Sequence, residues 1–346
     1  MLESIFRQMN PRWGVQPKTS LLVNSVTLFM DKIKENYLSK CKDTSPCANR
    51  PNLTILAVNP YNYRTVVSFN FDKVTNQCYW DNRILKYYNL LMKTNSIDKS
   101  FIGLRINVNE DDEFMLKLNV SSINLDKIYN FYEISNSLIN IQSFYFCFKE
   151  MPIYFAKSKT ITINLNGFRI PISPNSFVQA NHVMGNILYD KIAHLVHPNK
   201  NLLVYGRNSF HIASQVYKKF ETIKCLNPCP IAYEDGLDIV KTNNLNWLSV
   251  NTKESLYQEI NKSSPDTTII MSPGRNGYSY FDKIDLSKFK NKQIFYITCN
   301  IETMKRDIKD NFIITNNIMV ELFPGTIYNE HIIQLLLSKT TEASGN

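Results

Sequence analysis

The pattern of apolar and polar residues changes character near residue 175. Beyond that point, short apolar runs alternate with segments whose apolar residues recur every three or four positions. This pattern indicates buried strands that alternate with amphipathic helices. The predicted strands are 202–205, 222–226, 247–250, 267–271, 294–297, 313–320 and 332–337. Such alternation predicts a mostly parallel, doubly wound α/β sheet that binds ligands at the carboxyl ends of its strands.

The first half of the chain has a different pattern. A helix that ends near Tyr37 is predicted by apolar residues at helical spacing, namely Leu22, Val26, Phe29, Met30 and Ile33. Further strands are predicted at 54–58, 65–71, 104–108, 114–120, 142–148 and 160–165, with a helix near 83–93. We therefore expect two domains: an N-terminal α+β domain over residues 1–174 and an α/β domain over residues 175–346.

Charge distinguishes the two halves. The net charge is +9. Residues 1–175 hold 21 Lys and Arg against 14 Asp and Glu, whereas residues 176–346 hold 18 against 16. A basic half beside a nearly neutral half suits an RNA-binding part joined to a part that binds a small molecule. Lysines that merely keep the first half soluble would give the same balance, so charge alone does not decide.

The composition predicts an intracellular protein. No stretch approaches the roughly 20 apolar residues that a membrane-spanning helix needs, and no basic-then-apolar signal segment opens the chain. Seven scattered cysteines, an odd number, suggest a reducing compartment rather than a disulfide framework. We expect a soluble, cytoplasmic monomer.

Two residues at the ends of predicted strands could carry chemistry. Cys299 follows strand 294–297 at the start of a predicted helix, where the helix dipole favours a thiolate. Glu330 comes just before strand 332–337. Taken singly, each residue has an ordinary structural explanation, because free cysteines are usually buried and a lone glutamate is usually solvated. Together they are a possible nucleophile and a possible base.

The surrounding residues favour the chemical interpretation. Residues 296–308, YITCNIETMKRDI, resemble the Ser-Cys-Asn-Pro-x-Thr-x-x-x-Asp block of the RNA 5-methyluridine methyltransferases. Residues 322–335, LFPGTIYNEHIIQL, resemble the Phe-Pro-x-Thr-x-His-x-Glu ending of that family. Residues 175–181 resemble its Ser-Phe-x-Gln-x-Asn signature, and residues 60–71 resemble its His-Tyr-Arg-x-Arg-x-Glu-Phe strand. The resemblance spans most of residues 60–338.

This resemblance implies a fold and a reaction. The fold is a C-terminal Rossmann-like, seven-stranded methyltransferase sheet, with an N-terminal α+β domain on the RNA side. The implied cofactor is S-adenosyl-L-methionine and the implied partner is a substrate RNA. By motif position, Cys299 attacks carbon 6 of a uracil and Glu330 removes the proton from carbon 5. Gln179 contributes to the cofactor and substrate pocket, although a structural role as a helix cap is almost equally plausible.

Some relatives of this family carry an iron–sulfur cluster, which we do not expect here. Cys41 and Cys47 have the spacing that begins the cluster motif, but Arg50 occupies the position of the third cysteine. The placement after the predicted first helix also differs. We therefore expect neither an iron–sulfur cluster nor another metal.

The cofactor positions depart from the family pattern. The first strand of such a domain normally ends in a glycine-rich turn, whereas Tyr205 and Asn208 here flank the single Gly206. Asn227 stands where an acid should take the ribose hydroxyls, and Ser272 stands where the family has the aspartate of Asp-Pro-Pro-Arg. A charged hydrogen bond contributes about 1.5–3 kcal/mol, against about 0.5–1.5 for a neutral one. We therefore expect Asn227 and Ser272 to bind the cofactor more weakly than the acids of the family pattern would.

Two functions are compatible with this sequence. The first is an active methyltransferase that modifies carbon 5 of a uridine in RNA, for which Cys299 and Glu330 are retained. The second is a catalytically silent RNA-binding relative, which the altered cofactor positions favour. We prefer the first, because a silent protein would have little need for both residues.

Overall fold

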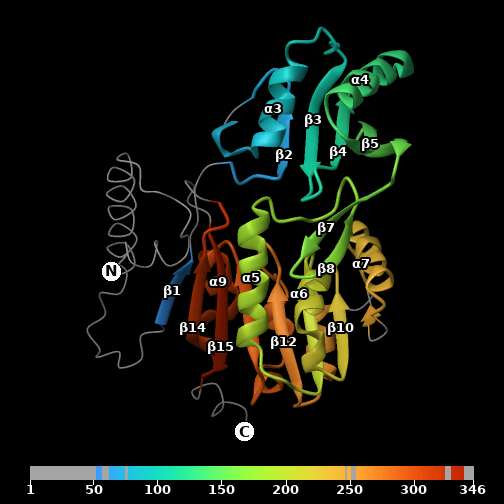
Figure 1. Ribbon diagram of the computed structural model, residues 1–346. Coiled ribbons are helices and arrows are strands. Elements are labelled where there is room, and N and C mark those ends of the chain that lie inside the picture. Colours follow the sequence, from blue (N-terminus) through green and yellow to red (C-terminus); the bar gives the residue numbers. More distant parts are fainter. Residues whose placement is uncertain are drawn as a thin grey trace, which may run out of the picture. The chain divides into compact units, whose positions relative to one another are not determined.

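The computed structural model describes residues 52–56, 62–74, 77–245, 248–250, 255–323 and 329–338. The chain divides into two compact units, 1–50 and 51–346, and all described residues belong to the second. The helix predicted to end near Tyr37 and the loop with Cys41 and Cys47 lie outside the described residues. Figure 1 shows the strands, which form three sheets of eight, five and two strands.

The eight-stranded sheet has the order β1-β14-β15-β13-β12-β9-β10-β11. Its strands are β1 (Asn52–Leu56), β9 (Asn201–Gly206), β10 (Thr222–Leu226), β11 (Leu248–Val250), β12 (Thr267–Ser272), β13 (Ile294–Thr298), β14 (Phe312–Val320) and β15 (Glu330–Leu337). Neighbouring strands run parallel, except that β15 is antiparallel to both β13 and β14. The seven strands from β9 onward confirm the predicted sheet.

The eighth strand corrects one prediction. Strand 54–58 was expected in the N-terminal α+β domain, but β1 pairs in parallel with β14 in the larger sheet. Its sequence could not reveal this, because an apolar strand carries no mark of its partner. The domain boundary at 174/175 itself stays a prediction.

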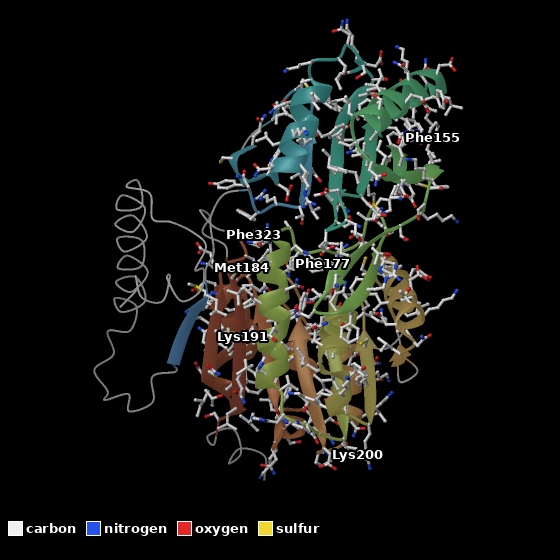
Figure 2. All side chains as sticks on the ribbon, viewed as in Figure 1. Phe155, Phe177, Met184, Lys191, Lys200 and Phe323 are labelled. Carbon is white, nitrogen blue, oxygen red and sulfur yellow. The ribbon has the colours of Figure 1, made fainter. Side chains whose placement is uncertain are left out.

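Helices cover both faces of the larger sheet. Met184, Leu188 and Ile192 of α5 (His182–Leu195) pack with α6 (Ser209–Val216) against one face, which includes Leu202 and Val204 (Figure 1). Met184 and Phe323 belong to this side of the core (Figure 2). The other face packs against α8 (Leu256–Lys262) and α9 (Ile301–Ile308). Helix α7 (Pro230–Thr242) follows β10.

The five-stranded sheet has the order β2-β3-β4-β5-β6. Its strands are β2 (Val66–Asn70), β3 (Phe101–Val108), β4 (Phe114–Val120), β5 (Ile141–Phe148) and β6 (Met151–Lys157), and its helices are α3 (Asn82–Leu91) and α4 (Leu125–Leu138). Both helices pack on one face, with Phe155 at the edge of that core (Figure 2). Helix α4 and strand β6 were not predicted from the apolar pattern. No helix in the described ranges is long and apolar enough to cross a membrane.

Strand 160–165 also differs from expectation. It was predicted to close the α+β domain, but β7 (Ile161–Leu165) pairs only with β8 (Phe168–Ile172) in a separate hairpin. Ile161, Ile163 and Ile170 of this hairpin pack into the core that α5 and α6 share with the larger sheet. The hairpin therefore belongs with the α/β part of the chain in its packing.

Gly206 is required by the close approach of β9 and β12. Its φ is +134°, and a Cβ atom there would lie 2.2 Å from the Ser272 carbonyl oxygen. We expect Gly206→Ala to lower the free energy of unfolding by about 3 kcal/mol, since it combines backbone strain with a steric clash. Gly167→Ala is the control: its φ is +89° but a Cβ meets nothing within 4 Å, so about 1 kcal/mol is expected. Equal shifts of the urea midpoint would contradict this explanation.

Candidate active site

Cys299 and Glu330 lie at the same edge of the larger sheet. Cys299 follows the last residue of β13, and Glu330 is the first residue of β15. Because β15 runs antiparallel to β13, Thr298 pairs with His331. The carboxyl end of one strand and the amino end of the other therefore meet, and the nucleophile and base proposed from the sequence are brought together.

Arg275 lies near both residues, on the loop that follows a third strand, β12. It lies three residues beyond the end of β12, in the Ser-Pro-Gly-Arg segment. Its guanidinium hydrogen-bonds to Cys299, and its charge lowers the pKa values of Cys299 and Glu330. The site thus holds a thiol, a carboxyl group and a permanent cation within electrostatic reach of one another.

The loop that carries Arg275 is fixed to helix α9. The Arg275 carbonyl oxygen accepts hydrogen bonds from Thr303 Oγ1 at 3.1 Å and from Asn300 Nδ2 at 3.4 Å. Asp307 Oδ2 accepts from the Tyr278 amide and the Tyr296 hydroxyl, both at 2.6 Å. Asp307 is buried, so these bonds are well shielded from water.

The pKa of the Cys299 thiol is raised, which corrects one expectation. Burial is the main cause, the negative charge of Glu330 adds to it, and Arg275 opposes both. The helix N-terminus was expected to favour the thiolate, but Asn300 is the N-cap of α9 and its side chain already accepts from the Thr303 amide. Arg275 supplies the charge that favours the thiolate, and a backbone hydrogen bond of Cys299 acts in the same direction.

Burial raises the pKa of Glu330 to about 8, against the opposing charge of Arg275. A solvated glutamate would show no such shift. At neutral pH the Glu330 carboxyl group is therefore protonated in most molecules. Once ionised, it is a stronger proton acceptor than an ordinary carboxylate.

Gln179, Asn208 and Glu330 all lie near one buried hydroxyl, that of Tyr189. The pKa of this hydroxyl is raised by burial and by Glu330. No described side chain meets hydrogen-bond geometry with that hydroxyl. Gln179 does not cap α5, since Asn181 is the N-cap and accepts from the Met184 amide at 3.1 Å. The structural alternative for Gln179 is therefore wrong.

The three remaining cofactor candidates end neighbouring strands but differ in their freedom. Tyr205 packs edge-on against Tyr278, with ring centroids 5.2 Å apart. Asn227 is committed: its Nδ2 donates to the Arg207 carbonyl at 3.3 Å and its Oδ1 accepts from the Cys229 amide at 3.1 Å. The Ser272 hydroxyl is hydrogen-bonded to none of the described residues. Ser272 is thus available to a ligand, whereas Asn227 clamps two loops together.

Buried polar atoms without partners test whether a polar ligand fits this edge. Ser209 Oγ, at the start of α6, and the Tyr189 hydroxyl have no hydrogen-bond partner among the described residues. Buried groups are ordinarily satisfied, so these two atoms are candidate partners for the polar groups of a ligand. A separate small hollow is lined by Ser176, Phe177, Arg207, His211 and Asp235. No cluster of His, Cys, Asp and Glu suited to a metal occurs within the described ranges.

Two residues of the site were not predicted from the sequence: Tyr189, and Asp307 as the residue that holds the Arg275 loop. Tyr189 lies among the apolar residues of α5, where an aromatic residue is indistinguishable from ordinary core. Asp307 closes the motif around Cys299, so a signal was present. Its role in holding the Arg275 loop depends on contacts with residues 278 and 296, which no local pattern shows.

The chain has sequence relatives among RNA methyltransferases, although no protein-family model matches it. An uncharacterized RNA methyltransferase of Fusobacterium nucleatum is 27% identical over 259 residues, which cover 70% of this chain and 53% of the relative. The 23S rRNA (uracil(747)-C(5))-methyltransferase of Photorhabdus laumondii is 26% identical over 200 residues, covering 55% and 51%. The resemblance to the RNA uracil-C5 methyltransferases is confirmed. The chain spans about half the length of these relatives.

A solved structure shows the fold. The tRNA (uracil-54, C5)-methyltransferase of Pyrococcus abyssi, in complex with S-adenosyl-L-homocysteine, has a TM-score of 0.64 at 17% identity. The match covers 83% of this chain and 79% of that one. The chain therefore has the predicted class I methyltransferase fold.

The raised pKa of Glu330 should make stability depend on pH. Between its unfolded pKa, near 4.5, and its folded pKa of about 8, the unfolded state loses the proton first. Unfolding is therefore favoured as pH rises through this window. Glu330→Gln should be more stable than wild type by about 1 kcal/mol or more at pH 8, and the difference should vanish near pH 4.5.

Urea unfolding at several pH values measures this difference. Glu302→Gln is the matched control, because Glu302 is exposed on α9 and forms a surface ion pair with Lys305. Its effect should not change across the window. A Glu330→Gln difference that is the same at both ends would mean that the folded protein ionises Glu330 normally.

Proposed function

We propose that this protein is an S-adenosylmethionine-dependent RNA methyltransferase that modifies carbon 5 of a uridine through a transient bond to Cys299. The convergence of Cys299, Glu330 and Arg275 at one sheet edge carries this proposal. The relatives are named methyltransferases, which favours an active enzyme over a silent RNA-binding protein. RNA is the proposed partner.

The first step is addition of Cys299 to the uracil ring. Carbon 5 of uracil is a poor nucleophile, so the 5,6 double bond must be opened first. The thiol gives its proton to water, sulfur bonds to carbon 6, and the electron pair of the double bond forms an enolate. Arg275 favours the thiolate because it hydrogen-bonds to Cys299. The target base must leave its stack to present carbon 6.

The second step is removal of the carbon 5 proton. S-adenosylmethionine would supply an electrophilic methyl group to carbon 5 of the enolate, and its S–CH3 bond would break to leave S-adenosylhomocysteine. Ionised Glu330 then takes the proton from carbon 5, the double bond re-forms and the Cys299 thiolate leaves. A pKa of about 8 suits this proton transfer near neutral pH. Arg275 also faces Glu330, so it favours the carboxylate that this step needs.

The residues present fit the cofactor in part. Ser209, Tyr189 and Ser272 offer polar groups that no described residue satisfies, and Gln179 and Asn208 lie beside Tyr189. Tyr205 would border the cofactor at the end of β9. Asn227 would hold the surrounding loops rather than the ribose, since its amide is already bonded on both sides.

Ser272→Asp should therefore tighten S-adenosylmethionine binding by roughly tenfold, which corresponds to about 1.4 kcal/mol from a charged hydrogen bond. Asn227→Glu should not tighten it, because it removes the donor to the Arg207 carbonyl. Calorimetric titration at millimolar cofactor measures both. No heat of binding from wild type or from Ser272→Asp would remove the cofactor from this proposal.

RNA that contains 5-fluorouracil should trap the enzyme. Addition and methyl transfer can proceed, but Glu330 cannot remove fluorine as it would a proton, so the bond to Cys299 persists. A band that resists denaturation is expected from wild type in the presence of S-adenosylmethionine. Cys299→Ala should abolish it, whereas Cys78→Ala, which replaces an exposed cysteine, should not.

Glu330→Gln should accumulate the adduct with ordinary RNA, since only the release step is lost. An adduct that forms equally with Cys299→Ala would assign the nucleophile to another residue. Absence of any adduct, with cofactor and RNA both bound, would contradict the covalent route.

A further inference from the structure

A row of five side chains crosses the five-stranded sheet on one face. Ser68 pairs with Arg105, Arg105 with Lys117, Lys117 with Tyr145, and Tyr145 with Tyr154. Directly opposed residues in a sheet project from the same face. We call these five residues the basic-aromatic row.

The row lies on the face away from the helices. The alternate residues of the same strands, such as Leu104, Leu116 and Phe144, pack against α3 and α4. On the row, Ser68 is exposed, Arg105 and Lys117 are partly buried, and Tyr145 is buried. Tyr154 on the edge strand β6 is 38% exposed. The sheet thus presents cations in its centre and an accessible ring at its edge.

The cations of this region lack carboxylate partners. Arg105 donates to Asn107 Oδ1 at 3.4 Å and to the Ser176 carbonyl at 3.3 Å. Arg207, whose charge acts on Arg105, donates to the sulfur of Cys229. None of Arg105, Lys117 and Arg207 forms an ion pair with a carboxylate in the described ranges. Their mutual repulsion is a cost that a bound anion would remove.

The electrostatics agree with this crowding of charge. Burial lowers the pKa of Arg105, and the charge of Arg207 lowers it further. Burial also lowers the pKa of Lys117, to which Arg105 contributes. Asp235 borders the row, near Tyr145, but its carboxylate accepts a hydrogen bond from Ser176 Oγ at 2.6 Å.

The cationic part of the row contacts the segment that precedes Gln179. Lys117 Nζ donates to Asn175 Oδ1 at 2.9 Å, and Arg105 contacts Ser176. Both contacted residues belong to the motif segment that leads to Gln179 and α5. A chain bound along the row would therefore reach the site through this segment.

The aromatic end of the row is held in place. The rings of Tyr145 and Tyr154 pack edge to face, with centroids 5.5 Å apart. The Tyr145 hydroxyl donates to the Lys159 carbonyl at 2.7 Å, and the Tyr154 hydroxyl donates to the Lys157 carbonyl. A fixed, partly exposed ring on the same sheet face as cations is a combination on which single-stranded nucleic acids stack.

We propose that the basic-aromatic row binds a single-stranded stretch of RNA beside the target uridine, with phosphates at Arg105, Lys117 and Arg207 and a base stacked on Tyr154. Three strand spacings of about 4.8 Å separate Arg105 from Tyr154, a span of roughly four stacked nucleotides at ~3.4 Å each. This inference rests on the proposed function for its RNA substrate. It adds the surface that the flanking nucleotides occupy.

Fluorescence anisotropy with the full chain tests the row, using a uridine-containing single strand of roughly 12 nucleotides. Tyr154→Ala should weaken binding by roughly fivefold or more, through loss of one stacked base. Tyr154→Phe should bind like wild type, because the ring remains although the bond to Lys157 is lost. Lys117→Gln should lower the slope of log affinity against log salt by about 0.7.

The matched controls lie on the helix-covered side of the sheet. Lys86 is exposed on α3 and Tyr129 on α4. Lys86→Gln and Tyr129→Ala should leave both the affinity and the salt slope unchanged. A circular dichroism melt of each variant separates loss of binding from loss of folding.

The outcomes distinguish this inference from the proposed function. If the fluorouracil adduct forms but Tyr154→Ala and Lys117→Gln bind RNA as wild type does, the row is wrong and the enzyme proposal survives. If both variants lose RNA but no adduct forms, the surface survives and the catalytic proposal fails. Equal competition by an acidic peptide, insensitive to Tyr154→Ala, would overturn the assignment to RNA.

Discussion

The antiparallel insertion of β15 between β13 and β14 is the constraint on which the candidate site depends. A parallel strand in that position would present its carboxyl end at this edge, and its first residue would lie at the far side of the sheet. Because β15 runs the other way, its first residue, Glu330, lies at the edge where β13 ends and Cys299 follows. A base is thereby placed beside a nucleophile with no long loop to hold it.

The same edge is tuned by one cation and one buried carboxylate. Arg275 is on a loop, and a loop would ordinarily be too mobile to set the pKa values of two neighbours. Asp307 restrains it by accepting bonds from Tyr278 and Tyr296. The charge that favours both the thiolate and the Glu330 carboxylate is thus carried by a loop that is held to α9 and β13 by hydrogen bonds with Thr303, Asn300 and Asp307.

Much of the fold was predictable because it follows from local pattern. The apolar runs placed β10 at its observed bounds and most other strands within a few residues. Pairing partners were not predictable, so β1 and β7 were assigned to the wrong part of the chain. In the site, motif position identified Cys299 and Glu330. It could not reveal that Asn227 is bonded on both sides, or that burial raises the Cys299 pKa, since both depend on contacts distant in sequence.

The pairing of β1 with β14 ties the two ends of the described chain together. Leu56 lies opposite Val320. During synthesis β1 is therefore made early, and its partner β14 is made only after most of the remaining chain. Until then β1 has an unpaired edge, which is open to wrong pairing. A fragment of residues 175–346 would lack β1, so the backbone hydrogen-bonding groups on the outer edge of β14 would be left without a strand partner. The larger sheet therefore combines strands that are distant in sequence, and it can be completed only late in synthesis.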